Sequence, residues 1–153
     1  MHDASILKRA GHDIGRSIAE KRKDMVYLGA DNALVMLTPN CSMLLTHPWA
    51  GSAYSISYRP QKMIEAMSGG EKPNILVIGH FHKAEYLFYR NIHCFQAGTF
   101  QAQTPFMRGK SLAAMLGGWI VEVEVNADGT ILKIKQEYIP YYQAIKDDWK
   151  NWR

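Results

Sequence analysis

Hydrophobic and polar positions repeat with two different periods along the chain, and the change of period separates helices from strands. In residues 5–22 apolar side chains recur every three or four positions, which predicts helical structure. Gly11 and Gly15 interrupt this segment, so we expect a short turn of helix and then a helix over 13–21 with Asp13 as its N-cap.

Short apolar runs typical of strands follow this helical segment. Further along the chain, Pro60 favours a helix over 61–67. Turns are expected near Arg90 and over 126–129, and residues 97–110 are expected to form a polar loop. The turn signal Pro39-Asn40 predicts a hairpin between the second and third strands. The expected strands are residues 25–28, 33–38, 41–46, 74–78, 85–89, 91–96, 117–125 and 130–139.

The order strand, helix, strand over residues 41–78 predicts a βαβ unit with two parallel strands. The strand over 74–78 is apolar throughout, which indicates burial on both faces of a sheet. We therefore expect an α/β (α+β) domain over residues 1–140, followed by an aromatic C-terminal tail over 141–153.

Histidines stand where two of the predicted strands end. His80 and His82 follow the buried strand after Gly79, and His47 follows the strand over 41–46. If these strands are parallel, their carboxyl ends lie at the same edge of the sheet, where open α/β sheets bind ligands. Neutral imidazole is a common ligand of transition metals. The sequence therefore predicts a metal site built from His47, His80 and His82.

Composition narrows the class of protein only a little. A formal net charge of +4 over 153 residues is compatible with an anionic substrate but gives no nucleic-acid footprint by itself. The two cysteines, Cys41 and Cys94, belong to no CxxC pair and are expected to be buried thiols. No apolar run reaches the roughly 20 residues that span a bilayer, so we expect a cytoplasmic protein that does not bind membranes.

The motif Gly79-His80-Phe81-His82 resembles the GHxH signature of calcineurin-like metallophosphoesterases, in particular small phage and prokaryotic members with a GHFH form. Thr46-His47-Pro48 resembles the histidine that precedes it in that family. The resemblance implies a β-sandwich of two sheets flanked by helices. It also implies that His47 and His80 bind one divalent metal and His82 a second, the metal being Mn, Zn or Fe. The implied reaction is hydrolysis of phosphate monoesters or diesters by a metal-bound hydroxide, with nucleotides and nucleic acids among the substrates.

The start of the chain resembles the second half of the family's GNHD motif. His2-Asp3 matches it, which would make His2 a catalytic residue that assists the leaving group. Gly11-His12-Asp13 is a competing match with one residue missing, and we prefer His2.

The sequence departs from the family in its aspartates. The DxH and GDxxD motifs have no counterpart, and Asp24, Asp31 and Asp128 stand in other contexts. The resemblance thus covers the C-terminal half to two-thirds of the family domain. We expect a truncated or split phosphoesterase that needs aspartate ligands from elsewhere, and whether the chain hydrolyses alone stays open.

Two alternatives to an enzyme remain. The fold can be an inactive interaction or structural module, because missing strands would leave an open sheet edge that invites a second copy or an N-terminal-half partner. The other alternative is a single-metal site in a protein without catalysis. His93 or Cys94 could join such a site, but not both, because neighbouring strand residues point to opposite faces.

Overall fold

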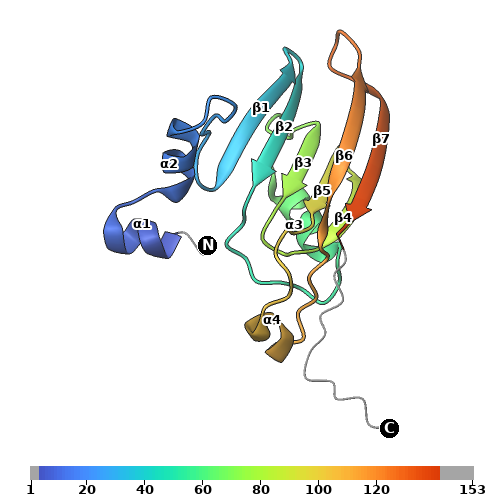
Figure 1. The fold of residues 1–153 in the computed structure, drawn as a ribbon. Coiled ribbons are helices and arrows are strands. Elements are labelled where there is room, and N and C mark those ends of the chain that lie inside the picture. Colours follow the sequence, from blue (N-terminus) through green and yellow to red (C-terminus); the bar gives the residue numbers. More distant parts are fainter. Residues whose placement is uncertain (1–3, 142–153) are drawn as a thin grey trace.

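The computed structural model describes residues 4–141 and has the mixed α/β architecture that the sequence predicts, with one five-stranded and one two-stranded sheet (Figure 1). The helices are α1 (Ala4–Ala10), α2 (Ile14–Glu20), α3 (Tyr58–Ala66) and α4 (Pro105–Gly109). The strands are β1 (Asn32–Thr38), β2 (Cys41–Thr46), β3 (Ile75–Ile78), β4 (Ala84–Tyr89), β5 (Ile92–Ala97), β6 (Gly117–Val125) and β7 (Ile131–Pro140).

Strand β3 is the centre of the larger sheet, whose order is β1-β2-β3-β5-β4. It runs parallel to β2 on one side and to β5 on the other, while β1 and β4 complete antiparallel pairs at the two ends. Leu76 of β3 lies between Leu44 and Cys94 in this register. The side chain of Leu76 is fully buried, and the expected parallel pairing and two-sided burial of this strand are confirmed.

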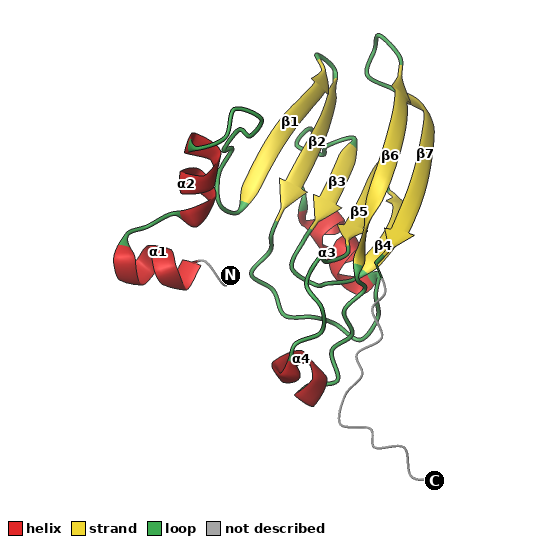
Figure 2. Ribbon diagram, viewed as in Figure 1, coloured by secondary structure: helices red, strands yellow, loops and turns green. Residues whose placement is uncertain are grey.

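The two faces of this sheet have different covers. On one face Ile64 of α3 packs with Leu76 and Cys94 in the main hydrophobic cluster. On the other face lies the β6–β7 hairpin: the rings of Phe95 and Trp119 are 5.6 Å apart, centroid to centroid. Figure 2 shows the result, with α3 on one side of the larger sheet and the hairpin on the other. The chain is thus layered as helix, sheet and hairpin.

The tip of the β6–β7 hairpin is tied to the larger sheet. The side-chain amide of Asn40, in the β1–β2 turn, donates a hydrogen bond of 2.9 Å to the carbonyl oxygen of Ala127. Asn74, just before β3, donates one of 3.3 Å to the carbonyl oxygen of Gly129. Gly129 has a φ of 92°, and a Cβ there would collide with the Asn40 carbonyl, so this contact requires glycine.

The predicted helices near the N-terminus are confirmed. They include the Asp13 N-cap, whose carboxylate accepts a hydrogen bond of 3.0 Å from the Arg16 amide. The strand expected over 25–28 is wrong: this segment has no regular structure and pairs with none of the described strands. Its apolar side chains Met25, Val26 and Leu28 are exposed, so no buried sheet face holds the segment.

Two further boundaries differ from expectation. The polar loop expected over 97–110 contains α4, capped by Thr104, whose hydroxyl accepts a hydrogen bond from the Met107 amide. Helix α3 begins at Tyr58, before the expected residue 61, and Pro60 lies within its first turn. Cys41 and Cys94 are buried and free, as expected. The proposed aromatic tail lies outside the described residues, apart from Tyr141.

Within the described residues no helix is long and apolar enough to span a membrane.

The central position of β3 predicts a steep loss of stability when its core is emptied. Leu76→Ala should lower the free energy of unfolding by about 2–5 kcal/mol, because it removes methyl groups from a fully buried position. Leu132→Ala, at a side chain that is 60% exposed, should change it by no more than about 0.5 kcal/mol. Urea unfolding of both variants is the measurement. Equal losses of unfolding free energy in the two variants would contradict the assignment of Leu76 to the core.

Candidate functional site

Parallel pairing of β2 and β3 brings two of the predicted histidines together. The backbone ladder continues beyond both strands, because the Gly79 amide donates a hydrogen bond of 2.9 Å to the Thr46 carbonyl. His47 and His80, the next residues, therefore lie side by side, with ring centroids 4.9 Å apart and an interplanar angle of 70°. A Cβ at Gly79 would lie 3.4 Å from Cδ2 of His47, an ordinary contact distance, so the His47 ring packs directly over this position.

The backbone at the motif is unusual. His80 has a φ of 76° and His82 a φ of 55°, so both adopt the left-handed conformation that residues other than glycine seldom take. The Phe81 amide donates a hydrogen bond of 3.0 Å to the Gly79 carbonyl, and this bond closes a tight turn centred on His80. Buried Phe81 anchors this turn in the core. Such strain persists only where surrounding structure imposes it, and it concentrates at functional sites.

The two adjacent imidazoles lie in different environments. Nδ1 of His47 is buried and has no hydrogen-bond partner, which is costly unless a ligand or water satisfies it. Burial lowers the pKa of His80, and the nearby His47 lowers it further, while a hydrogen bond to the Ala50 backbone opposes the shift. His80 therefore favours the neutral form, which can bind a metal.

His82 has a different place in the site. It lines a cavity of about 700 Å³ together with His80, Phe81 and Lys83. Its carbonyl oxygen accepts a hydrogen bond of 2.8 Å from the Met115 amide. In the described residues no three His, Cys, Asp or Glu side chains are arranged to hold one ion. The structure thus brings His47 and His80 into contact and sets His82 on the cavity wall.

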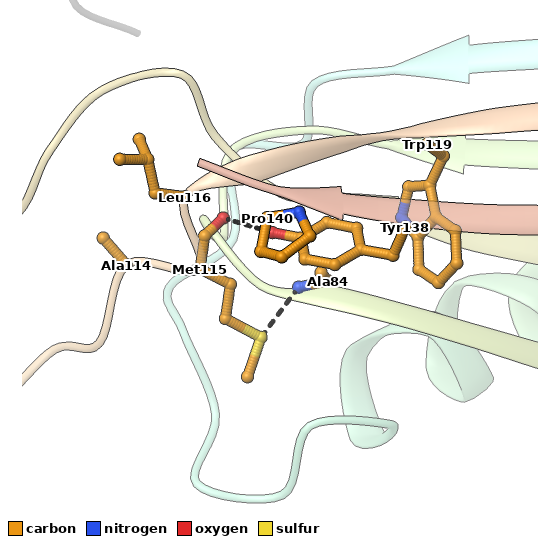
Figure 3. A pocket seen from close by; sticks show the side chains of 7 residues that line it. All are labelled: Ala84, Ala114, Met115, Leu116, Trp119, Tyr138 and Pro140. Carbon is orange, nitrogen blue, oxygen red and sulfur yellow. Dashed lines mark hydrogen bonds between the residues drawn. The ribbon is translucent and has the colours of Figure 1, made fainter. Parts of the chain in front are cut away.

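Met115 links this wall to the β6–β7 hairpin. Its sulfur accepts a hydrogen bond of 3.0 Å from the Ala84 amide, and its carbonyl accepts one of 3.0 Å from the Tyr138 hydroxyl (Figure 3). A second cavity of about 430 Å³ lies here, lined also by Trp119 and Pro140. Among the described residues that line this cavity, Tyr138 is the titratable one, and the others are mainly apolar.

The remaining sequence candidates lie elsewhere. His2 lies outside the described residues, so its catalytic role stays a prediction. His12 is exposed, with its ring 3.2 Å from the Ser17 hydroxyl. His93 is on β5, where Nδ1 lies 2.8 Å from the Tyr86 hydroxyl. Neither His12 nor His93 lines the cavity beside His80.

Sequence analysis missed several features of the site. Asp31 lies beside His47 across the β1–β2 pair: its carbonyl accepts a hydrogen bond of 2.8 Å from the His47 amide. Its Oδ1 is buried without a hydrogen-bond partner. The cavity residues Lys83 and Phe106 were missed too. The pair Thr104-Pro105 was a usable signal for α4, since an N-cap threonine before proline is typical of a helix start.

Comparison with known proteins yields structural likeness only. Neither a protein-family model nor a curated protein matches the sequence. The solution structure of Thermotoga maritima protein TM1076 is 16% identical, with a TM-score of 0.34, and the match covers 71% of this chain and 53% of that one. A single mutant of Vps29 from Entamoeba histolytica is 18% identical, with a TM-score of 0.39, covering 76% of this chain and 65% of that one. This chain thus spans between half and two-thirds of each, and at such TM-scores neither likeness decides its family.

The left-handed backbone at His82 predicts an unequal response to two substitutions. His82→Gly should leave the protein more stable than His82→Val by about 1–2 kcal/mol, because glycine adopts a positive φ without a steric penalty. The same two changes at His12, whose φ is not positive, provide the control and should show no comparable advantage for glycine. Thermal or urea unfolding measures both pairs. A Val variant as stable as the Gly variant would contradict the assigned conformation.

Proposed function

We propose that this chain carries part of a metallophosphoesterase-type site that hydrolyses phosphate monoesters or diesters. His47 and His80 bind one divalent transition metal, Mn, Zn or Fe, and His82 contributes to binding a second. The observation that carries the proposal is the pairing of two strand-end histidines, with rings 4.9 Å apart, beside a turn in which two histidines hold a left-handed backbone.

The donor set fits a metal in part. His47 offers a buried ring nitrogen without a partner, and burial lowers the pKa of His80 and favours its neutral, ligating form. When bound, a metal ion activates water and offsets the charge of a phosphate. The protein's own residues orient the imidazoles, and the described residues that line the cavity include no acidic side chain that would repel an anion.

Carboxylates are the missing part of this site. Two cations held close together need a bridging carboxylate, and the imidazoles of His47, His80 and His82 carry no negative charge. Asp31 is bonded to His47 through its backbone carbonyl, but among the described residues it forms no three-residue ligand group with the two histidines. Full activity therefore depends on aspartate ligands from another polypeptide segment or a second copy.

Metal binding should respond selectively to the histidine pair. We expect His80→Ala and His47→Ala each to lower the affinity for Zn²⁺ at least tenfold, since even residues that only orient ligands have effects of about 10–100-fold. His12→Ala removes an exposed histidine and should leave the affinity unchanged. Isothermal titration calorimetry measures all three. Equal affinity for Zn²⁺ in all three variants would contradict the proposed metal site.

A second function, as an interaction module, has its own support at strand β1. β1 pairs only with β2 among the described strands, and residues 32–38 include no charged side chain of the kind that protects natural sheet edges. Leu34 and Met36 point to one face of the sheet and are 62% and 54% exposed. Antiparallel pairing of two β1 strands around Val35 would set Leu34 opposite Met36 of the second copy, a self-complementary contact.

This edge predicts self-association that one charge should abolish. We expect native protein to form a dimer that becomes more populated with concentration, and Leu34→Lys to stay monomeric because the edge then carries repelling charges. Leu132→Lys, at an equally exposed leucine of β7, should behave as native protein does. Light scattering after size exclusion measures the mass. A monomer at every concentration, or a dimer that survives Leu34→Lys, would contradict this interface.

A further inference from the structure

We infer that the substrate is a nucleoside phosphate, because the cavity beside His80 and His82 has an exposed aromatic side chain on each of its two loop walls. The inference rests on the proposed phosphoesterase function and narrows its substrate class. The cavity measures about 700 Å³, within the range of about 300–1,000 Å³ of pockets that hold small molecules.

The cavity is bounded by three segments of the chain. Residues 80–83 carry the histidine motif and Lys83. Residues 52–54 form one wall, and residues in the range 101–113, which includes α4, form the other. Tyr54 belongs to the first wall and Phe106 to the second. A ligand in this cavity thus meets both imidazoles of the motif and aromatic side chains from both loops.

Hydrogen bonds to the scaffold fix the first wall. Nζ of Lys83 donates to the Ala53 carbonyl at 2.7 Å. Nε2 of Gln96, whose side chain is almost fully buried, donates to the Ile56 carbonyl at 2.8 Å. These two bonds join the loop that carries Tyr54 to β5 and to the histidine motif. The loop is therefore positioned by Lys83 and the buried Gln96, and not by Tyr54 itself.

The second wall is fixed within its own loop. Nε2 of Gln103 donates a hydrogen bond of 2.8 Å to the Leu112 carbonyl and closes the loop around α4. The Thr104 cap holds the first turn of this helix. Buried Met107 anchors α4, while its neighbour Phe106 is 69% exposed. The helix thus presents an aromatic ring that its own packing does not require.

Two exposed aromatic side chains at one cavity favour a ligand with a planar ring. Tyr54 is fully exposed, so neither it nor Phe106 is held in the core. Any nucleobase can stack on such a ring, because every base has a π face. A sugar phosphate or a phosphoserine side chain has no planar aromatic ring to stack. With its phosphate at the histidines, a nucleoside phosphate would use both parts of the cavity.

Binding of three phosphate compounds to the zinc-loaded full chain tests the inference. Adenosine 5′-monophosphate should bind about tenfold more tightly than ribose 5-phosphate, by the stacking contribution of its base, and ribose 5-phosphate should bind about as well as inorganic phosphate. Tyr54→Ala and Phe106→Ala should each reduce this advantage and leave the affinity for ribose 5-phosphate unchanged. Phe88→Ala, at an exposed ring of β4 outside the cavity lining, is the matched control and should preserve it. Calorimetry or ligand-observed NMR gives the affinities.

The outcomes separate this inference from the proposed function. If the three compounds bind equally well and only with metal present, the nucleoside assignment is overturned and the phosphoesterase proposal stands. An advantage of the nucleotide that survives both Tyr54→Ala and Phe106→Ala also overturns it. If no compound shows metal-dependent binding, the proposed function fails, and the inference built on it fails with it.

Discussion

The buried parallel pairing of β3 with β2 and β5 is the constraint on which the rest of the structure depends. Its register sets Leu76 at the centre of the core and carries the backbone ladder on to Gly79. Because β2 and β3 run in the same direction, their ends meet at one edge of the sheet. His47 and His80 are neighbours for that reason, although 32 residues, which include α3 and β3 itself, separate them in the sequence.

The core beside β3 also offsets the cost of the left-handed turn over residues 80–82. Left-handed backbone at His80 and His82 is unfavourable for residues with a Cβ, and the fold offsets it by burying Phe81 between them. Glycine at either position would avoid the strain, so the histidines contribute something that stability does not require. The proposed metal ligation beside the cavity would account for both the strain and the residue type.

Much of this arrangement is predictable from sequence, because it depends on local periodicity and turn chemistry. The apolar run before Gly79, the Pro39-Asn40 turn and the alternation in β6 and β7 each specify an element without reference to the rest of the chain. The sequence predictions that were wrong or missing concern features that depend on tertiary contacts. Residues 25–28 have the composition of a strand but find no partner to pair with. The positions of Asp31 and Phe106 beside the histidine site depend on cross-strand register and loop closure, which no local pattern encodes.

The central claim is that His47 and His80 form one metal centre, and locating the ion tests it most directly. Anomalous diffraction from crystals of the zinc-loaded protein gives the position of the metal without reference to activity. The account predicts a peak at about 2.0–2.1 Å from a ring nitrogen of each of these two histidines. A peak at His12 or His93 instead, or no ordered metal in crystals grown with excess zinc, would contradict it.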